Sequence, residues 1–204
     1  MTLKPVTDGS RLERKKEETK QKILTVAMPL FMKHGVDAIT MEQIAEEADL
    51  AKGTLYNYFP VKEAIIDEYI QRSFIQRSSE RLERIRRMPD TRARMIQTLS
   101  DLMQGVQAQK DIFEKYFTYR IRNMISLNQS ESAQSGLYLL ETEIITLGQK
   151  NAEIRTDLPL DILTGLFEFA FVNVAQQFYK EPGKFKPRKV IEQCVDLFMN
   201  GVRA

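Results

Sequence analysis

The sequence predicts an all-α protein. Apolar residues recur at spacings of three and four along most of the 204 residues, which is the pattern of helices that bury one face. The chain contains only nine glycines and seven prolines. No Asn-Gly or Asp-Gly pair lies between alternating runs, as a β-hairpin would require. Hydrophobic residues make up 43% of the chain and charged residues 28%, the composition of an ordinary globular protein with a real core.

The scarcity of two residue types excludes several kinds of site. Cys194 is the only cysteine and His34 the only histidine, so neither an internal disulfide nor a zinc module can form within the chain. No glycine-rich phosphate loop is present, and a nucleophile would have no histidine partner except His34. We therefore expect no metal, no cofactor and no enzymatic activity.

Neither a membrane segment nor a strong overall charge marks this chain. No apolar run approaches the roughly 20 residues that cross a bilayer, and the N-terminus has no apolar signal segment. The sequence therefore predicts a cytoplasmic protein without a membrane partner. The formal net charge of +2 does not by itself indicate a nucleic-acid binder. Binding of phosphates would have to come from local placement of charge.

Residues 40–59 predict two short helices joined by a tight turn. Thr40 is followed three residues later by Gln43, the spacing of a capping box, so a helix should begin here. Its apolar face is then formed at helical spacing by Met41, Ile44, Ala45 and Ala48. Residues 49–51 interrupt the pattern. In the second segment Leu55 and Phe59 share one face.

The outward face of the second segment has an unusual composition. A solvated helix normally carries Lys and Glu together, yet no acid occurs between Lys52 and Phe59. Thr54 and Asn57 can address base edges in a major groove, whereas Lys52 and Tyr56 reach phosphate oxygens. Spacing alone fits an ordinary helical hairpin with half-buried tyrosines equally well.

The run from about Ile23 to Lys62 resembles the DNA-binding domain of the TetR family of bacterial transcriptional regulators. The residues that carry the resemblance are Ile23, Ala27, Leu30, Phe31, Gly35, Thr40, Ile44, Ala45, Ala48, the run Lys52-Gly53-Thr54-Leu55-Tyr56-Asn57-Tyr58-Phe59, and Lys62-Glu63. The resemblance implies an N-terminal three-helix helix-turn-helix domain plus a C-terminal helical ligand-binding and dimerisation domain. The DNA-binding candidates are Thr40, Ala51, Lys52, Gly53, Thr54, Tyr56, Asn57 and Lys62.

Three ranges divide the chain. Residues 1–16 lack apolar periodicity and are expected to form a flexible basic arm, which either follows the DNA or only solubilises the chain. Residues 17–62 are expected to form the DNA-binding domain, with a first helix over 17–33 that ends at Gly35. Residues 63–204 are expected to bind an effector and to dimerise.

A long helix is predicted from Lys62 to about Arg87. Lys62 lies where the free amides of a helix N-terminus favour an anion, so we expect it to contact a phosphate. The arginines further along alternate with glutamates and are interpreted as a solvated, partly paired face. They are Arg72, Arg77, Arg81, Arg84, Arg86 and Arg87.

The remaining apolar stripes predict five more helices. They cover about 92–106, 112–124, 137–147, 160–178 and 187–202, with a polar loop over 126–135. The last two stripes are broader than a monomer needs, which favours a two-fold interface. The resemblance implies the same, because the final two helices form the dimer in this family.

The effector region is the least determined part of the sequence. An apolar cavity with a cation for an acidic, lipid-like effector would use Phe113, Tyr116, Phe117, Arg120, Phe167 and Phe171. The same side chains could equally fill the core. The leading functional hypothesis is a repressor that binds a palindromic operator on the bacterial nucleoid as a dimer and is released by a small apolar or amphipathic effector. The alternative is an effector-independent architectural or division-associated DNA-binding protein.

Overall fold

The computed structural model describes residues 8–124 and 136–203, and all the regular elements in these ranges are helical. The prediction of an all-α protein is confirmed for them. The elements are α1 (Asp8–His34), α2 (Met41–Glu47), α3 (Lys52–Tyr58), α4 (Lys62–Gln76), α5 (Ser78–Arg86), α6 (Thr91–Ala108), α7 (Lys110–Met124), α8 (Gly136–Lys150), α9 (Leu160–Lys180), a 3-10 turn (Pro182–Lys184) and α10 (Pro187–Val202). The predicted loop over 126–135 lies outside the described residues.

The first helix begins earlier than predicted. We expected it to start at Glu17, but α1 starts at Asp8. Residues 11–18 are exposed, so this part of the helix extends beyond the core. This segment has no apolar face from which a helix could have been predicted. Side chains of high helix propensity continue the helix, and Arg14 pairs with Glu18 one turn further on at 3.5 Å. Gly35, with φ of +85°, follows the last helical residue as expected.

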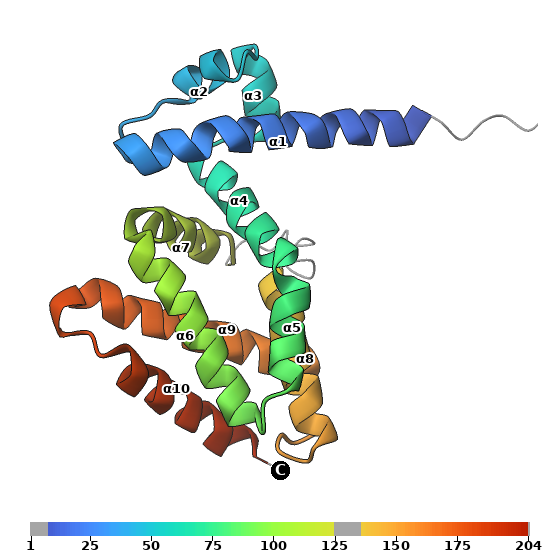
Figure 1. The fold of residues 1–204 in the computed structure, drawn as a ribbon, viewed down its shortest axis with the longest axis vertical. Coiled ribbons are helices and arrows are strands. Elements are labelled where there is room, and N and C mark those ends of the chain that lie inside the picture. The colour runs from blue at the N-terminus through green and yellow to red at the C-terminus, as the bar shows by residue number, and fades with distance from the viewer. Residues whose placement is uncertain (1–7, 125–135, 204) are drawn as a thin grey trace, which may run out of the picture.

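The N-terminal helices pack around a small core. Its fully buried side chains are Ile23, Ala27, Phe31, Ile44, Ala48, Leu55 and Phe59. Leu30, which we also expected there, is only half-buried. Figure 1 shows α2 and α3 on one side of the long α1, with α4 leading from them into the rest of the molecule. This core holds α3 at the protein surface.

The predicted helix from Lys62 to Arg87 is divided at Arg77, so the expectation of one continuous helix is wrong. The hydroxyl of Ser78 donates to the carbonyl oxygen of Ile75 at 2.7 Å, which competes with the helical hydrogen-bond pattern at this point. The backbone of Gly136 also lies against Phe74 and Ile75, and a Cβ there would be 2.5 Å from the carbonyl carbon of Phe74. The division therefore coincides with the contact between α4 and α8.

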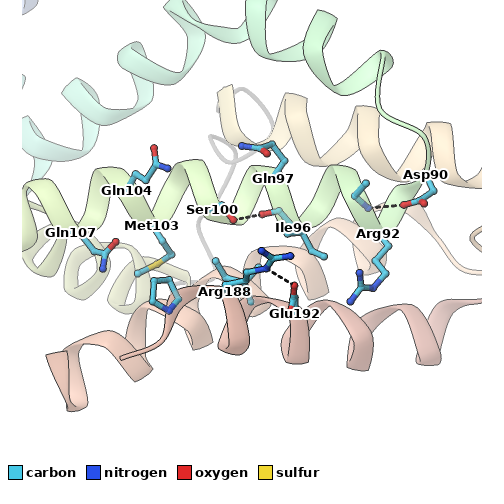
Figure 2. Close-up of a pocket in the computed structure, with 13 residues that line it drawn as sticks. Asp90, Arg92, Ile96, Gln97, Ser100, Met103, Gln104, Gln107, Arg188 and Glu192 are labelled. Carbon is cyan, nitrogen blue, oxygen red and sulfur yellow. Dashed lines mark hydrogen bonds and ion pairs between the residues drawn. The ribbon is translucent and has the colours of Figure 1, made fainter. Parts of the chain in front are cut away.

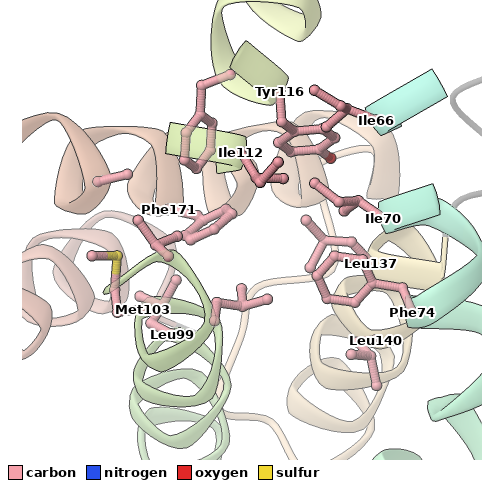
Figure 3. Close-up of a cluster of buried hydrophobic side chains, with 14 of the residues drawn as sticks. Ile66, Ile70, Phe74, Leu99, Met103, Ile112, Tyr116, Leu137, Leu140 and Phe171 are labelled. Carbon is pink, nitrogen blue, oxygen red and sulfur yellow. The ribbon is translucent and has the colours of Figure 1, made fainter. Parts of the chain in front are cut away.

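The second core lies among α4, α6, α7, α8 and α9. Figure 3 shows side chains from these helices converging, among them Ile70, Leu99, Tyr116, Leu140 and Phe171. Helix α10 packs against both α6 and α9. Figure 1 places α9 and α10 at the end of the molecule remote from α2 and α3. No helix in the described ranges is long and apolar enough to span a membrane.

Candidate nucleic-acid interface and effector site

The α2–α3 unit has the local geometry that the sequence predicts. The Gln43 amide donates to Thr40 Oγ1 at 3.1 Å, and the Thr40 amide donates to Gln43 Oε1 at 2.8 Å, which completes the capping box. The turn passes through Asp49, whose φ of 47° is one that aspartate tolerates better than most residues. The amide of Leu50 then donates to the carbonyl of Ala45 at 2.9 Å. These bonds fix the angle at which α3 leaves α2.

Helix α3 separates its core side from its outward side. Leu55 is fully buried, whereas Lys52, Tyr56 and Asn57 are exposed and Thr54 is half-buried. A Cβ at Gly53 would meet nothing within 4 Å. Glycine inside a helix costs about 1 kcal/mol relative to alanine. Among the described residues, no contact requires a glycine at this position.

Ala51 and Thr40 precede the two helices. Ala51 is the N-cap residue of α3 and makes no side-chain cap, so its exposed methyl group is available for an apolar contact, such as one with a thymine methyl group. The Thr40 hydroxyl accepts its capping hydrogen bond and keeps its own O–H to donate to a phosphate. Both residues lie on the same short unit as Lys52.

An acid from α2 contacts the outward face of α3. The Glu42 carboxylate forms an ion pair with Lys52 Nζ and accepts a long hydrogen bond of 3.5 Å from the Tyr56 hydroxyl. Lys52 Nζ also lies 5.9 Å from the centroid of the Tyr56 ring. The hydrogen bond from Lys52 lowers the pKa of Glu42, and the same bond raises the pKa of Lys52. Sequence reasoning missed Glu42, because it considered each helix separately.

Lys62 has a role that the sequence did not predict. Its Nζ donates to the carbonyl oxygen of Val36 at 2.7 Å and to that of Ile39 at 2.8 Å. Two of its three N–H donors therefore secure the connection between α1 and α2. We expected a phosphate contact here, and for the remaining N–H donor of Lys62 that contact stays a prediction.

Charged pairs connect α1 to α4 and the α1–α2 connection to α7. Lys20 on α1 donates to Glu68 on α4 at 3.0 Å, and Arg72 bonds to the same carboxylate at 2.7 Å. Burial acts to raise the pKa of Glu68, but the bonds from Lys20 and Arg72 outweigh it and the pKa is lowered. Lys115 on α7 pairs with Asp37 in the α1–α2 connection at 2.7 Å. Movement of α4 or α7 would thus be transmitted to α1 and α2.

Four of the six predicted effector residues line one small cavity of about 10 Å³: Tyr116, Phe117, Arg120 and Phe171. Phe117 also lines a groove of about 440 Å³ between α7 and α9. Phe167 is fully buried, and Tyr116 and Phe171 belong to the core of Figure 3. Arg120 Nη2 lies 3.2 Å from a carboxylate oxygen of Glu168, whereas its Nε is buried without a hydrogen-bond partner among the described residues. Binding of an effector by these six residues stays a prediction.

Phe113 lines a different cavity, which lies between α4, α5, α6 and α7. This cavity has a volume of about 190 Å³. Its apolar wall includes Ile70, Phe74, Leu102 and Phe113, and it also meets Arg77, Arg81 and Asp101. It is therefore an apolar space with cations at its polar side.

Arg81 is the best-placed cation of this cavity. Its guanidinium carbon lies 5.0 Å from the centroid of the Phe74 ring, and its Nη1 is buried without a hydrogen-bond partner among the described residues. Burial lowers the pKa of Arg81, and the positive charge of Arg77 lowers it further. An incoming anion would offset both the cost of burying the Arg81 charge and its repulsion by Arg77. Sequence reasoning had assigned both arginines to a solvated face, although Phe74, Arg77 and Arg81 follow one another at spacings of three and four.

A larger groove of about 660 Å³ lies between α6 and α10. Figure 2 shows that its charged side chains are already engaged within the protein: Arg188 bonds to Glu192 at 3.0 Å, and Asp90 caps the amide of Ala93 at 2.7 Å. Arg92, which also lines it, bonds to Asp196 at 2.7 Å. The groove therefore offers weaker means of recognising a charged ligand than the smaller cavity does.

Comparison with known proteins agrees with this arrangement. Residues 23–69 match the family model described as "Bacterial regulatory proteins, tetR family". Over these residues, this chain is similar to regulators of the TetR family.

Two kinds of relatives cover nearly the whole of this chain. The HTH-type transcriptional repressor KstR2 of Rhodococcus jostii is 22% identical over 99% of this chain and 98% of its own length. FadR of Thermus thermophilus, a repressor solved in complex with lauroyl-CoA, has the same fold at a TM-score of 0.76 and 22% identity, over 91% of this chain and 95% of its own. FadR of Bacillus subtilis in complex with stearoyl-CoA matches with a TM-score of 0.57 and 17% identity, over 90% of this chain and 99% of its own.

The chain also exposes an aligned apolar stripe on α9. Ile162, Leu166 and Phe169 are four and three residues apart, so they lie on one face, and they are 49%, 47% and 59% exposed. On the neighbouring α10, Leu197 is 76% exposed. Scattered exposed apolar residues are ordinary, but a stripe of large side chains on two packed helices marks an interaction surface.

Proposed function

We propose that this chain is a transcriptional repressor that binds a two-fold operator as a homodimer and leaves it when an amphipathic anion binds the second domain. The observation that carries the proposal is the outward face of α3, where Lys52, Gly53, Tyr56 and Asn57 are presented on a rigid three-helix core. A recognition helix held in this way enters the major groove with its N-terminal residues toward the bases.

The proposed interface divides its contacts between phosphates and bases. Lys52, Tyr56 and the Thr40 hydroxyl contact phosphates, which position the protein without reading sequence. Thr54 and Asn57 contact base edges, and the methyl group of Ala51 adds an apolar contact. Gly53 allows the DNA backbone to come close.

Tyr56→Phe is expected to weaken binding to operator and to random duplex by a similar factor, because it removes a phosphate contact. Thr54→Ala is expected to weaken operator binding preferentially, by about fivefold to tenfold. Competition binding with operator and random duplexes, monitored by fluorescence anisotropy, measures both ratios. If the two variants changed the ratio of operator to random affinity alike, this division of contacts would be wrong.

The operator itself is identified by footprinting the DNA upstream of the protein's own gene. We expect protection of a short palindrome by the wild-type protein. An effector-independent architectural protein would instead protect DNA with little sequence discrimination and would stay bound to the DNA in the presence of effector. The two functions are therefore separated by the same experiment, performed with and without acyl-CoA.

Dimerisation through α9 and α10 is proposed from the exposed stripe of Ile162, Leu166, Phe169 and Leu197. A two-fold axis through these helices would bury the stripe against its own copy. It would also present two copies of α3 to successive major grooves, about 34 Å apart. The spacing of the two copies then becomes the quantity that an effector can change.

The proposed effector is an amphipathic anion of the acyl-thioester class. The cavity beside Phe74 and Phe113 would receive the apolar part, and Arg81 would meet the acidic part. The two FadR structures hold acyl-CoA molecules of this kind. At about 190 Å³ the cavity accepts only a short apolar group, so a longer chain requires α7 to move away from α4.

This requirement links the effector to DNA binding. Helix α4 is joined to α1 through Glu68, and α7 is joined to the α1–α2 connection through Asp37. Separation of α4 from α7 would shift each DNA-binding unit and alter the spacing of the pair. A ligand needs only a higher affinity for the altered spacing than for the DNA-bound one.

Arg81→Gln is expected to raise the concentration of lauroyl-CoA that releases half of the bound operator by about tenfold, since a charge-assisted hydrogen bond is lost. Arg87→Gln is the matched control, because Arg87 is an exposed arginine of the same segment and does not line the cavity. Equal lauroyl-CoA requirements in the two variants would place the anion elsewhere. No release of the wild-type protein would exclude this class of effector.

A further inference from the structure

We propose that the Glu42 carboxylate occupies, in the DNA-free protein, the place that a DNA phosphate takes between Lys52 and Tyr56, and thereby lowers the affinity for DNA of every sequence. The inference rests on the proposed function, because it assumes that α3 meets DNA. It goes further by assigning a role to an acid on α2 and by locating one phosphate site.

The contacts of Glu42 are those that a phosphate oxygen would make. Lys52 Nζ pairs with the carboxylate, and the Tyr56 hydroxyl approaches one of its oxygens at 3.5 Å. A carboxylate and a phosphate are both acceptors that favour cationic and hydroxyl donors. Lys52 and Tyr56 are held together as well, since the ammonium lies 5.9 Å from the ring centroid. The two donors are thus arranged around an anion before DNA arrives.

The contacts are also exposed enough to be exchanged. The side chain of Lys52 retains 61% of its accessible surface and that of Glu42 retains 49%. An ion pair this open is weak, so a polyanion can compete for its cation.

The effect should be independent of sequence. Lys52 and Tyr56 address the DNA backbone, which carries no direct sequence information. The cost of separating Lys52 from Glu42 therefore falls equally on operator and random duplex. Glu42 would set the overall affinity and its salt dependence, whereas Thr54 and Asn57 would set the preference for the operator.

Glu42→Gln tests the inference. Gln can still accept the Tyr56 hydrogen bond, but it cannot form the ion pair. Affinity for operator and random duplex should rise by the same factor, roughly threefold for each recognition helix and about tenfold for a dimer with two copies. The dependence of affinity on salt should become steeper, by about one counterion for each helix. Glu46→Gln, at an exposed acid one turn further along α2, should change affinity much less.

A double-mutant cycle separates contact from general charge. In a Lys52→Gln background, the gain from Glu42→Gln should shrink to the level of the Glu46→Gln control, because the cation that Glu42 holds is gone. An undiminished gain would mean that Glu42 acts only through the long-range field, and the inference would be overturned. An absence of gain in the wild-type background would overturn it as well. If the wild-type protein and Glu42→Gln both ignored DNA at low salt, the proposed function itself would fail.

Discussion

Leu197→Glu is expected to convert the dimer to a monomer and to reduce operator affinity at least a hundredfold. Leu197 is 76% exposed on α10, the helix that packs against α9, whose exposed stripe includes Leu166 and Phe169. In a two-fold interface each new carboxylate would be buried close to its own copy, which is costly for both charges. A monomer binds one half-site only. In a dimer, binding of the first α3 holds the second at a high effective concentration near its half-site, and a monomer loses this gain.

Sedimentation velocity measures the first effect, and fluorescence anisotropy with an operator duplex measures the second. Leu12→Glu is the matched control for oligomeric state, since Leu12 is 66% exposed on α1, far from α9 and α10. It should leave the sedimentation coefficient unchanged. A Leu197→Glu protein that still sediments as a dimer would show that α10 is not the interface.

Gly136→Ala is expected to lower the free energy of unfolding by about 2 to 3 kcal/mol, because it overpacks the contact between α4 and α8. An added Cβ would lie 2.5 Å from the carbonyl carbon of Phe74 and 2.6 Å from the amide nitrogen of Ile75. Both are backbone atoms, so the two helices must move apart. Urea denaturation followed by circular dichroism measures the change.

Gly183→Ala provides the comparison. A Cβ at Gly183 would meet nothing within 4 Å, and the residue lies in the exposed turn before α10. Its unfolding free energy should stay within about 0.5 kcal/mol of the wild-type value. Equal stabilities of the two variants would mean that α8 does not pack against α4 as closely as described.

Local signals predicted the DNA-binding unit well. The capping box of Thr40 and Gln43, the apolar face of α2, and Gly35 at the end of α1 each depend on residues a few positions apart. For the same reason the sequence could not place Lys62, whose acceptors Val36 and Ile39 lie 26 and 23 residues earlier. Nor could it place Glu42 against Lys52, because that contact depends on the angle between α2 and α3.

The packing around the effector residues could not be predicted from the sequence, for a related reason. Apolar spacing identifies the buried face of a helix, but whether that face meets a core or a cavity depends on how several helices pack. Tyr116 and Phe171 were expected at a ligand and lie in the core. Arg81 was expected in solvent and meets the cavity beside Phe74. The boundary at Arg77 coincides with the hydrogen bond from Ser78 to Ile75 and with the contact between α4 and α8, and apolar spacing indicates neither.

The central claim is that two copies of α3 act as a pair matched to one turn of DNA. A series of duplexes with the operator half-sites separated by increasing numbers of base pairs tests it most directly. Affinity should be highest at a centre-to-centre spacing of about ten base pairs and should fall by roughly a hundredfold when about five base pairs are inserted, because the second half-site then faces away. Equal affinity at both spacings would contradict the account.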